Sequence, residues 1–455
     1  LMDEKVHHQY YLKKCLNKGV AYHFGGIPEE IKLRIENLYK HGLIKFLFCT
    51  STLLEGVNLP AKNIFILSEK IGDGRMSDID FWNLAGRAGR LRKDISGNIF
   101  CVNLYNQNGY WKDSKDIKIL RKKEIAEIKP QILSNTNENL YKNIGNYLEQ
   151  KDYSNKKLSA EQKKTIEMYG NILLFHDSIK NDSVLKDRFI DSNKNSVSLL
   201  RKTRNSLIVP PEILATSIDI NIANQNKIAI SGVSSLPTST KREDCLEVLN
   251  ILYEQYKWIE TESGGRNPMI RHKNQLKYYA TLMESWINTK PLKVLIQRTI
   301  NYFYNNGDER NIYIRQEDGR LRPVKFDKEN EFHINKLIND VVSDIENILR
   351  FKIKNYISNY QALLKNKGNL GASVVDWESY IEYGTTDNKT IEIQNLGFPR
   401  NIAIFLRNNY LKAFKKNKAG IFCSVDEIYL KNNINKDKYR FEYEELSLFM
   451  SWEKR

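Results

Sequence analysis

Long apolar runs and paired cysteines are both absent from this sequence of 455 residues. No stretch approaches the roughly 20 apolar residues that a membrane-spanning helix requires, and no signal-peptide pattern opens the chain. The cysteines are odd in number and scattered, without C-x-x-C spacing: Cys15, Cys49, Cys101, Cys245 and Cys423. These absences argue against a disulfide framework and against membrane attachment, and they predict a reducing cytoplasm as the compartment.

Metal-ligand spacing is missing as well. The seven histidines do not pair with cysteines or carboxylates, and the adjacent His7 and His8 are poorly placed to chelate a metal from a helix. No Ser/His/Asp set and no pair of carboxylates stands out locally. We therefore expect no metal site on this chain and no hydrolytic site of the serine or paired-carboxylate type.

Positive charge predominates, with 71 Lys plus Arg against 55 Asp plus Glu and a formal net charge of +16. A basic surface favours polyanions, with an affinity that falls as salt rises. Local basic runs lie at 112–129 and 407–418, and each can instead be the solvated face of a helix. The 25 tyrosines and 6 tryptophans offer stacking surfaces for unpaired bases, although we expect most of them in the core.

A glycine and arginine run at 83–90, NLAGRAGR, is the most informative stretch. Glycine allows a backbone to approach an anion closely, and the guanidinium group binds phosphate bidentately and is always charged. A solvated loop would share this composition. Two upstream segments favour the phosphate interpretation.

Both upstream segments join a short apolar run to small polar residues or glycines. They are GVAYHFGGIPEE at 19–30 and KFLFCTSTLLEGVNLPA at 45–61. The residues that follow the apolar runs are His23, Gly25 and Gly26 in the first segment and Thr50, Ser51 and Thr52 in the second. Pro28 marks the start of a helix, and a buried strand in each segment would deliver these polar residues to a loop.

In this order and spacing, the three segments resemble the second RecA-like lobe of superfamily 2 helicases, in the superkiller-like DExH branch. HFGGIPEE is similar to the stretch after motif IV, TSTLLEGVNLPA resembles motif V, and NLAGRAGR resembles motif VI. The resemblance covers about the first 105 residues. Further along, ESWINTKPLKVLI at 284–296 looks like the helical accessory region of these helicases.

The resemblance implies a role for each motif residue. Arg87 and Arg90 would be arginine fingers that reach the nucleotide from the second lobe, a contribution of roughly 10^3 to 10^5 in rate. The nucleotide side of the site would be completed by Asn83, Gly86, Gly56 and Asn58. Of these, Gly56 and Asn58 would couple the nucleotide cleft to the bound nucleic-acid strand. The nucleic-acid backbone would be bound by Thr50, Ser51, Thr52, His23, Gly25 and Gly26, without reading of sequence. A lone histidine after an apolar run is about as often a packing residue.

The departures from the family pattern matter equally. Asn83 stands where motif VI usually has the longer Gln, which puts its contact toward the nucleotide in doubt. No phosphate loop GxxxxGK[ST] and no DExH motif occurs in the chain, so ATP and Mg²⁺ would be bound mainly by a missing first lobe. Since the chain also opens with Leu1, we expect a fragment of a longer protein.

The predicted fold is an α/β RecA-like lobe, a parallel sheet flanked by helices, followed by a mainly α-helical accessory region. We expect buried strands near Val20, Phe46, Ile64 and Ile99, and helices at 29–41 and 78–88. Three domains are predicted: the lobe at 1–107, a helical and possibly winged-helix-like connector at 108–235, and a helical bundle at 236–455. The segment 396–418 is predicted to form an amphipathic basic helix that contacts DNA or RNA or docks the first lobe.

Two functions from different classes remain. The first is the C-terminal part of an ATP-dependent helicase or translocase, an NTP hydrolase when complete and inactive as an ATPase without the first lobe. The second is a non-catalytic nucleic-acid-binding or scaffolding module that retains the RecA-like fold. Both arginines occur beside the TST and GVNLP segments, which favours the first. The expected partners are single-stranded DNA or RNA and the first lobe. The sequence does not decide between DNA and RNA, and it does not give the polarity of translocation or the biological pathway. It also leaves open which helix contacts the strand, any protein partner and the oligomeric state.

Overall fold

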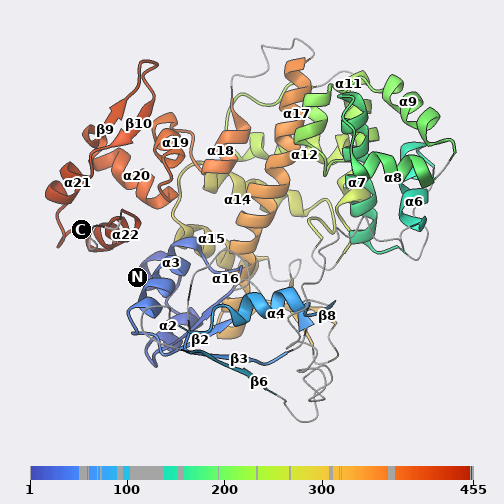
Figure 1. The fold of residues 1–455 in the computed structure, drawn as a ribbon. Helices are drawn as coiled ribbons and strands as arrows, with labels where there is room; N and C mark the ends of the chain where they lie inside the picture. Colours follow the sequence, from blue (N-terminus) through green and yellow to red (C-terminus); the bar gives the residue numbers. More distant parts are fainter. Residues whose placement is uncertain are drawn as a thin grey trace. The chain divides into compact units, whose positions relative to one another are not determined.

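The computed structural model divides the chain into two compact units, which are described separately (Figure 1). Unit 1 comprises 1–127, 292–343 and 431–455, and unit 2 comprises 128–291 and 344–430. The residues that the structure describes are 2–50, 59, 61–68, 70–71, 74–89, 96–102, 138–151, 158–192, 194–231, 234–265, 268–306, 311–316, 318, 320–366, 375–450 and 452. The three predicted domain ranges stay a prediction.

Unit 1 combines short strands with helices from the two ends and the middle of the chain. Its first stretch contains α1 (Met2–Lys5), α2 (Tyr11–Leu16), β1 (Val20–His23), α3 (Glu29–Lys40), β2 (Phe46–Cys49), β3 (Asn63–Ile66), β4 (Lys70–Ile71), β5 (Gly74–Arg75), α4 (Asp78–Ala85) and β6 (Asn98–Cys101). The other stretches add α15 (Leu292–Asn305), β7 (Asn311–Arg315), β8 (Leu321–Lys325), α16 (Glu331–Ser343) and α22 (Arg440–Phe449).

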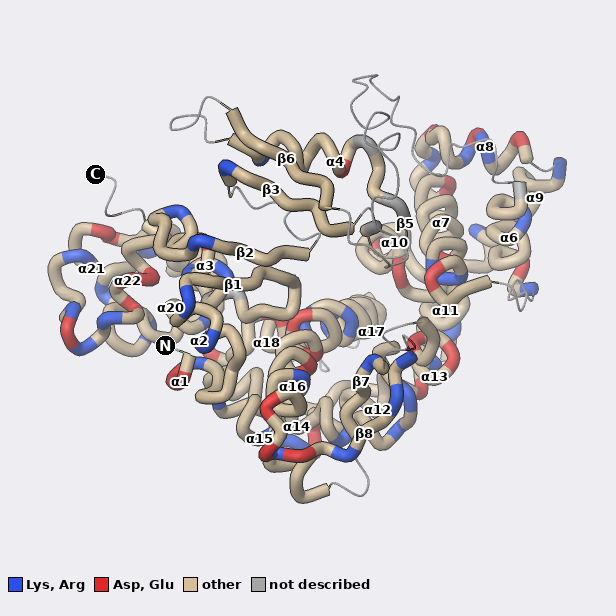
Figure 2. Tube along the Cα trace, turned by 90° about the horizontal axis from the view of Figure 1, so that it is seen from below, with Lys and Arg blue, Asp and Glu red and all other residues tan. Residues whose placement is uncertain are grey.

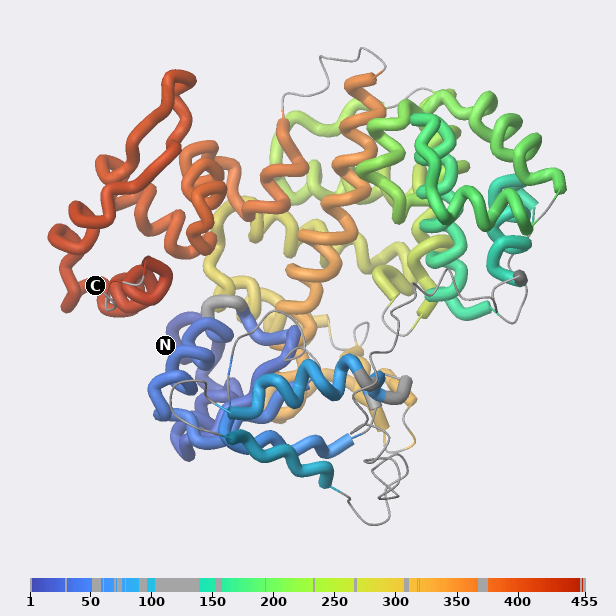
Figure 3. The backbone as a smooth tube through the Cα atoms, viewed as in Figure 1, coloured from blue at the N-terminus to red at the C-terminus, as the bar shows by residue number. Residues whose placement is uncertain are grey.

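Unit 2 is mainly helical, as the periodicity of its apolar residues predicts. Its first stretch contains α6 (Glu138–Leu148), α7 (Ala160–Ser178), α8 (Val184–Ser192), α9 (Ser196–Ser206), α10 (Pro211–Thr216), α11 (Ile222–Ser231), α12 (Arg242–Gln255), α13 (Trp258–Thr261) and α14 (Gln275–Ile287). The second contains the π-helix η3 (Asp344–Ile353), α17 (Lys354–Asn366), α18 (Trp377–Tyr383), α19 (Asn388–Asn395), α20 (Arg400–Asn409), η5 (Leu411–Ala413), β9 (Phe414–Lys416) and β10 (Phe422–Val425), with α21 (Glu427–Asn433) crossing the boundary. Figure 3 follows the same path as a tube coloured along the sequence.

The α/β character expected of the first hundred residues is present, with strands at all four expected positions and helices α3 and α4 between them. The pairing differs from a single sheet. Among the described residues, β1 pairs in parallel with β2, and β3 pairs in parallel with β6, as separate two-stranded sheets. A parallel α/β arrangement is therefore present, while a continuous RecA-like sheet is not seen in the described part of the chain.

The expectation that these apolar strands are buried is wrong for one face of each strand pair, which is exposed to solvent. Phe46 and Phe48 on β2 are 63% and 59% exposed, and Phe65 on β3 is 59% exposed. Because side chains alternate along a strand, only the other face of each pair packs on a helix. Charged residues are correspondingly scarce on these strands and are mixed in sign along the helices (Figure 2).

The segment 396–418 is not one basic helix. Helix α20 ends at Asn409, and the lysines that follow lie on and beside the antiparallel hairpin formed by β9 and β10. The run Asn408-Asn409-Tyr410 consists of modest helix formers. Gly420, with φ at +79°, allows the hairpin to turn.

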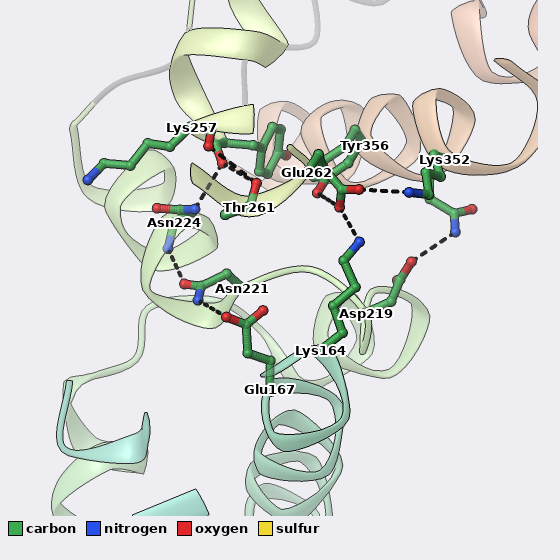
Figure 4. Close-up of polar contacts among 12 residues, drawn as sticks. Lys164, Glu167, Asp219, Asn221, Asn224, Lys257, Thr261, Glu262, Lys352 and Tyr356 are labelled. Atoms are coloured by element: carbon green, nitrogen blue, oxygen red, sulfur yellow. Dashed lines mark hydrogen bonds and ion pairs between the residues drawn. The ribbon is translucent and has the colours of Figure 1, made fainter. Parts of the chain in front are cut away.

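A buried carboxylate, Glu262, connects distant segments of unit 2 (Figure 4). It follows α13 and is only 5% exposed. Its oxygens lie 2.6 Å from Lys164 Nζ on α7 and 2.9 Å from Lys352 Nζ on η3, and the Tyr356 hydroxyl on α17 donates to it at 2.9 Å. Burial alone would favour the neutral acid, but the two ammonium groups lower the pKa of Glu262 below its ordinary value. Glu262 is thus held charged among three helices.

We expect Glu262→Gln to destabilise the full chain by roughly 1–3 kcal/mol at neutral pH, because two ammonium groups and a buried hydroxyl lose their charged acceptor. Since the pKa of Glu262 is lowered on folding, its contribution is complete above about pH 4.5 and is lost as pH falls through the lowered pKa. The difference in Tm between the two proteins should therefore shrink in acid. Glu260→Gln is the matched control, because Glu260 is 65% exposed in its ion pair with Lys257. Equal Tm losses for both variants would contradict the assignment.

Candidate nucleotide and nucleic-acid site

Two of the predicted strand-binding segments begin at the same edge of unit 1. In the parallel pair of β1 and β2, His23 stands opposite Cys49, and the Thr50 N–H donates to the His23 carbonyl at 3.3 Å. The glycine loop after β1 and the hydroxyl segment after β2 therefore start side by side. Thr50 and Gly25 are exposed and Gly26 is half-buried. Ser51, Thr52, Gly56 and Asn58 lie outside the described residues.

His23 itself is buried, with 3% of its surface exposed. Its Nε2 lies 3.5 Å from Glu36 Oε1 on α3, a contact that becomes an ion pair only if the ring is protonated. Neither ring nitrogen has a hydrogen bond among the described residues. The burial favours a packing role under α3, while the predicted contact with nucleic acid stays a prediction.

Helix α4 carries the start of the NLAGRAGR segment and is fixed at its first turn and along its buried face. Ser77 and Asp80 form a reciprocal capping box, each side chain accepting a backbone N–H of the other. Phe81 is buried with Ile66 of β3 and Met76. The end of the helix is thus held against the β3 and β6 pair. At this end, Asn83 and Gly86 are exposed and Arg87 is half-buried, whereas Arg90 lies outside the described residues.

Backbone hydrogen bonds join the end of the second segment to the arginine segment. The Ala61 N–H donates to the Arg87 carbonyl at 3.0 Å, and the Gly89 N–H donates to the Ala61 carbonyl at 2.8 Å. Ala61 and Ala88 thereby form an isolated parallel bridge. Leu59, just before this bridge, is buried. The residue that follows GVNLP is therefore hydrogen-bonded to the backbone on both sides of Ala88.

Glycine is required at two positions around this bridge. Gly89 has φ at +98°, a conformation that side chains rarely adopt. At Gly97, an added Cβ would lie 2.3 Å from the Ala88 carbonyl carbon and the Gly89 nitrogen. Gly86, by contrast, ends α4 with φ at −64°. The sequence analysis included Gly86 among the site residues and missed Gly97. The sequence indicates Gly97 only by its position just before the strand β6.

An open pocket in unit 2 was not predicted from the sequence. It has a volume of about 520 Å³ and lies beside the Glu262 network, with lysines from three segments among its lining residues: Lys151, Lys163, Lys164 and Lys257. Asn221 and Glu167 line the same pocket and bond to each other at 3.2 Å (Figure 4). Glu167 and Glu260 offset part of the positive charge.

Neither a membrane span nor a metal cluster is found in the part of the chain that the structure describes. Within those residues, no helix has the length and apolarity needed to cross a bilayer. The same residues hold no group of three His, Cys, Asp or Glu side chains placed to bind a metal ion. The guanidinium group of Arg87 and the backbone amides beside it are groups that suit phosphate.

Comparison with known proteins gives matches to the first part of the chain. The helicase conserved C-terminal domain matches residues 2–92. Anti-bacteriophage protein B of Escherichia coli K12 is 37% identical over 88 residues, which is 19% of this chain and 12% of that protein. The Saccharomyces cerevisiae antiviral helicase SKI2 is 37% identical over 98 residues, 21% of this chain and 8% of that protein.

The human exosome RNA helicase MTR4 is 32% identical over 104 residues, 22% of this chain and 10% of that protein. The matched part therefore spans about a tenth of the length of these relatives. It contains the parallel pair of β1 and β2, strand β3, helix α4 and the arginine segment up to Arg90. Residues 2–92 thus match the helicase conserved C-terminal domain, and the similarity to these relatives supports a C-terminal portion of a superfamily 2 DExH helicase.

Proposed function

We propose that this chain is a C-terminal portion of an ATP-dependent motor that moves along single-stranded nucleic acid or unwinds a duplex in the cytoplasm, completed by a first lobe of the same protein. The observation that carries the proposal is the bridge between Ala61 and Ala88. The bridge joins the segment expected to bind the nucleic-acid strand, which ends at Ala61, to the segment that carries the arginines. A non-catalytic module that retains the fold would keep this bridge, so the preference for a motor comes from the presence of both Arg87 and Arg90 beside it.

The residues of this chain supply charge and coupling in the proposed mechanism. Arg87 and Arg90 reach the phosphates across the cleft between lobes, and their guanidinium groups stabilise the negative charge that develops as water attacks the γ-phosphorus and ADP leaves. Guanidinium suits this task because it is planar, always charged and bidentate. The first lobe supplies the phosphate loop and the ligands of Mg²⁺, which neutralises charge on the β- and γ-phosphates when bound.

Strand binding is coupled to this chemistry through the backbone. Thr50 and the hydroxyls after it contact the phosphates of the strand, and the chain continues through Gly56 and Asn58 to Ala61. The two hydrogen bonds of Ala61 then fix the carbonyl of Arg87 and the N–H of Gly89. A shift of the strand-binding loop is thereby transmitted to the arginines. DNA and RNA are both compatible with contacts to phosphate alone.

The first experiment concerns Arg87. In the full-length protein, Arg87→Ala should lower nucleic-acid-stimulated ATP hydrolysis by about 10^3-fold or more, while the affinity for single strands stays within twofold, roughly the uncertainty of such a measurement. Arg90→Ala should behave alike. Lys45→Ala removes an exposed cation from the same unit and should leave turnover intact.

The readout is turnover with and without single-stranded DNA and single-stranded RNA, beside strand affinity by fluorescence anisotropy. Retained turnover in both arginine variants would refute the finger assignment. If the unmodified full-length protein hydrolyses no ATP under any of these conditions, the non-catalytic binding module becomes the better description.

The second experiment concerns the backbone around the bridge. Gly97→Ala should strongly reduce stimulated ATP hydrolysis, because its Cβ cannot fit against Ala88 and Gly89 without displacing them. Gly145→Ala is the matched control: Gly145 lies in α6 of unit 2, outside the candidate site, and its added Cβ would lie 3.9 Å from Leu199, an ordinary contact, so we expect a small effect. Turnover and thermal melting are measured together. Equal turnover in the two variants would contradict the coupling role of the bridge.

A further inference from the structure

The helices α19 and α20 and the hairpin β9–β10 of unit 2 form one module, residues 388–425, here called the hairpin module. Helix α19 ends at Asn395 and α20 begins at Arg400, with Gly397 at φ +95° in the four-residue turn between them. Two helices joined by a short turn containing glycine and followed by a hairpin have the order of a winged helix-turn-helix. Figure 1 shows the hairpin extending beyond the two helices.

The hairpin is fixed to the helices by apolar packing and one polar contact. Phe398 of the turn packs edge-on against Phe414 of β9 with ring centroids 6.1 Å apart, and Phe414 contacts Phe422 of β10 at 5.2 Å. The Phe422 N–H donates to Glu392 Oε2 of α19 at 2.9 Å. Asn417 orders the tip by accepting from the backbone of Ala419 at 2.9 Å and of Ile421 at 3.1 Å. The hairpin is therefore held in one position relative to α19.

The hairpin sequence contains basic residues and no acidic ones. From Ile393 to Val425 the sequence contains six Lys or Arg and no Asp or Glu. Two of the six are used inside the fold. Arg400 stacks on Trp286 at 4.1 Å and donates to the Gly384 carbonyl, and Arg407 pairs with Asp387 through two contacts of 3.1 Å.

Four exposed lysines remain, and no ion pair is found for any of them among the described residues: Lys412, Lys415, Lys416 and Lys418. Three of them lie on the hairpin, where Lys416 Nζ also approaches the Phe422 ring at 5.5 Å. The nearest acids in the sequence are Glu392, which contacts Phe422, and Asp426, just after the hairpin. Because like charges repel one another, the lysines between them leave the hairpin surface positively charged. A polyanion would relieve this repulsion.

The exposed residues of the hairpin also indicate which polyanion fits. Binding of unpaired bases usually combines basic residues with exposed aromatic rings, but both hairpin phenylalanines are buried. The exposed positions are Lys, Asn, Ala, Gly, Ile, Cys and Ser. We propose that the hairpin module binds the phosphate backbone of a nucleic-acid duplex, with Lys415, Lys416 and Lys418 as the contacts. The inference rests on the proposed function only in taking nucleic acid as the substrate of the whole protein.

The test compares duplex affinity of the full-length protein with that of a triple variant, Lys415→Ala, Lys416→Ala and Lys418→Ala. With a blunt duplex that has no single-stranded tail, the variant should bind about tenfold or more weakly, and the slope of log affinity against log salt should fall by roughly 3. The matched control replaces Lys194, Lys202 and Lys241 by Ala, which removes the same charge from exposed positions elsewhere in unit 2. This control should bind the duplex like the unmodified protein.

A conservative variant guards against misfolding. Lys415→Arg, Lys416→Arg and Lys418→Arg together should retain duplex affinity, and all variants should melt at the same temperature. Equal losses in the hairpin and control variants, or a loss confined to single strands, would overturn the proposal. ATP hydrolysis of the unmodified protein with single strands is measured alongside, so a failure of the motor assignment is distinguished from a failure of the duplex contact.

Discussion

The close approach of three backbone segments at Ala61, Ala88 and Gly97 is the constraint on which the candidate site depends. The Ala61 backbone is hydrogen-bonded to Arg87 and Gly89, the two neighbours of Ala88. Position 97 lies so close to Ala88 that there is no room for a side chain there. Backbone positions are less adjustable than side chains, because a shifted amide loses its partner. The orientation of the arginine segment is therefore set by main-chain geometry, with the Phe81 core and the capping box of α4 as its support.

Charge is used in two opposite ways in unit 2. Around Glu262, opposite charges are buried together with a tyrosine hydroxyl, and the network joins α7, η3 and α17. A buried carboxylate is acceptable only when it is paired. On the hairpin module, lysines face solvent with no acid between Ile393 and Val425. Paired charge in the interior holds helices together, whereas uncompensated charge at the surface is suited to an anionic partner.

Several expectations follow the local sequence closely, and the failures have a common cause. The strands β1, β2, β3 and β6 and the helices α3 and α4 form where the short apolar runs, Pro28 and the expected helix at 78–88 predict them. The prediction that the strands are buried was wrong at Phe46, because the strands form two-stranded sheets with one face exposed to solvent. The predicted basic helix ends at Asn409. The lysines beyond it belong to a hairpin, and Phe414 of this hairpin packs against Phe398 in the turn before α20. In both cases distant contacts decided the outcome.

By itself, the sequence determined the family resemblance, the order of the three motifs, the mainly helical remainder and the residues expected to carry phosphate chemistry, because these depend on residue type and local spacing. Only the tertiary structure decided that Gly97 belongs beside Ala88 and Gly89, that His23 is buried under α3, and that Glu262 joins two lysines and Tyr356. Such contacts unite residues far apart in the chain. No local pattern encodes them, since they arise from packing and from the pairing of buried polar groups.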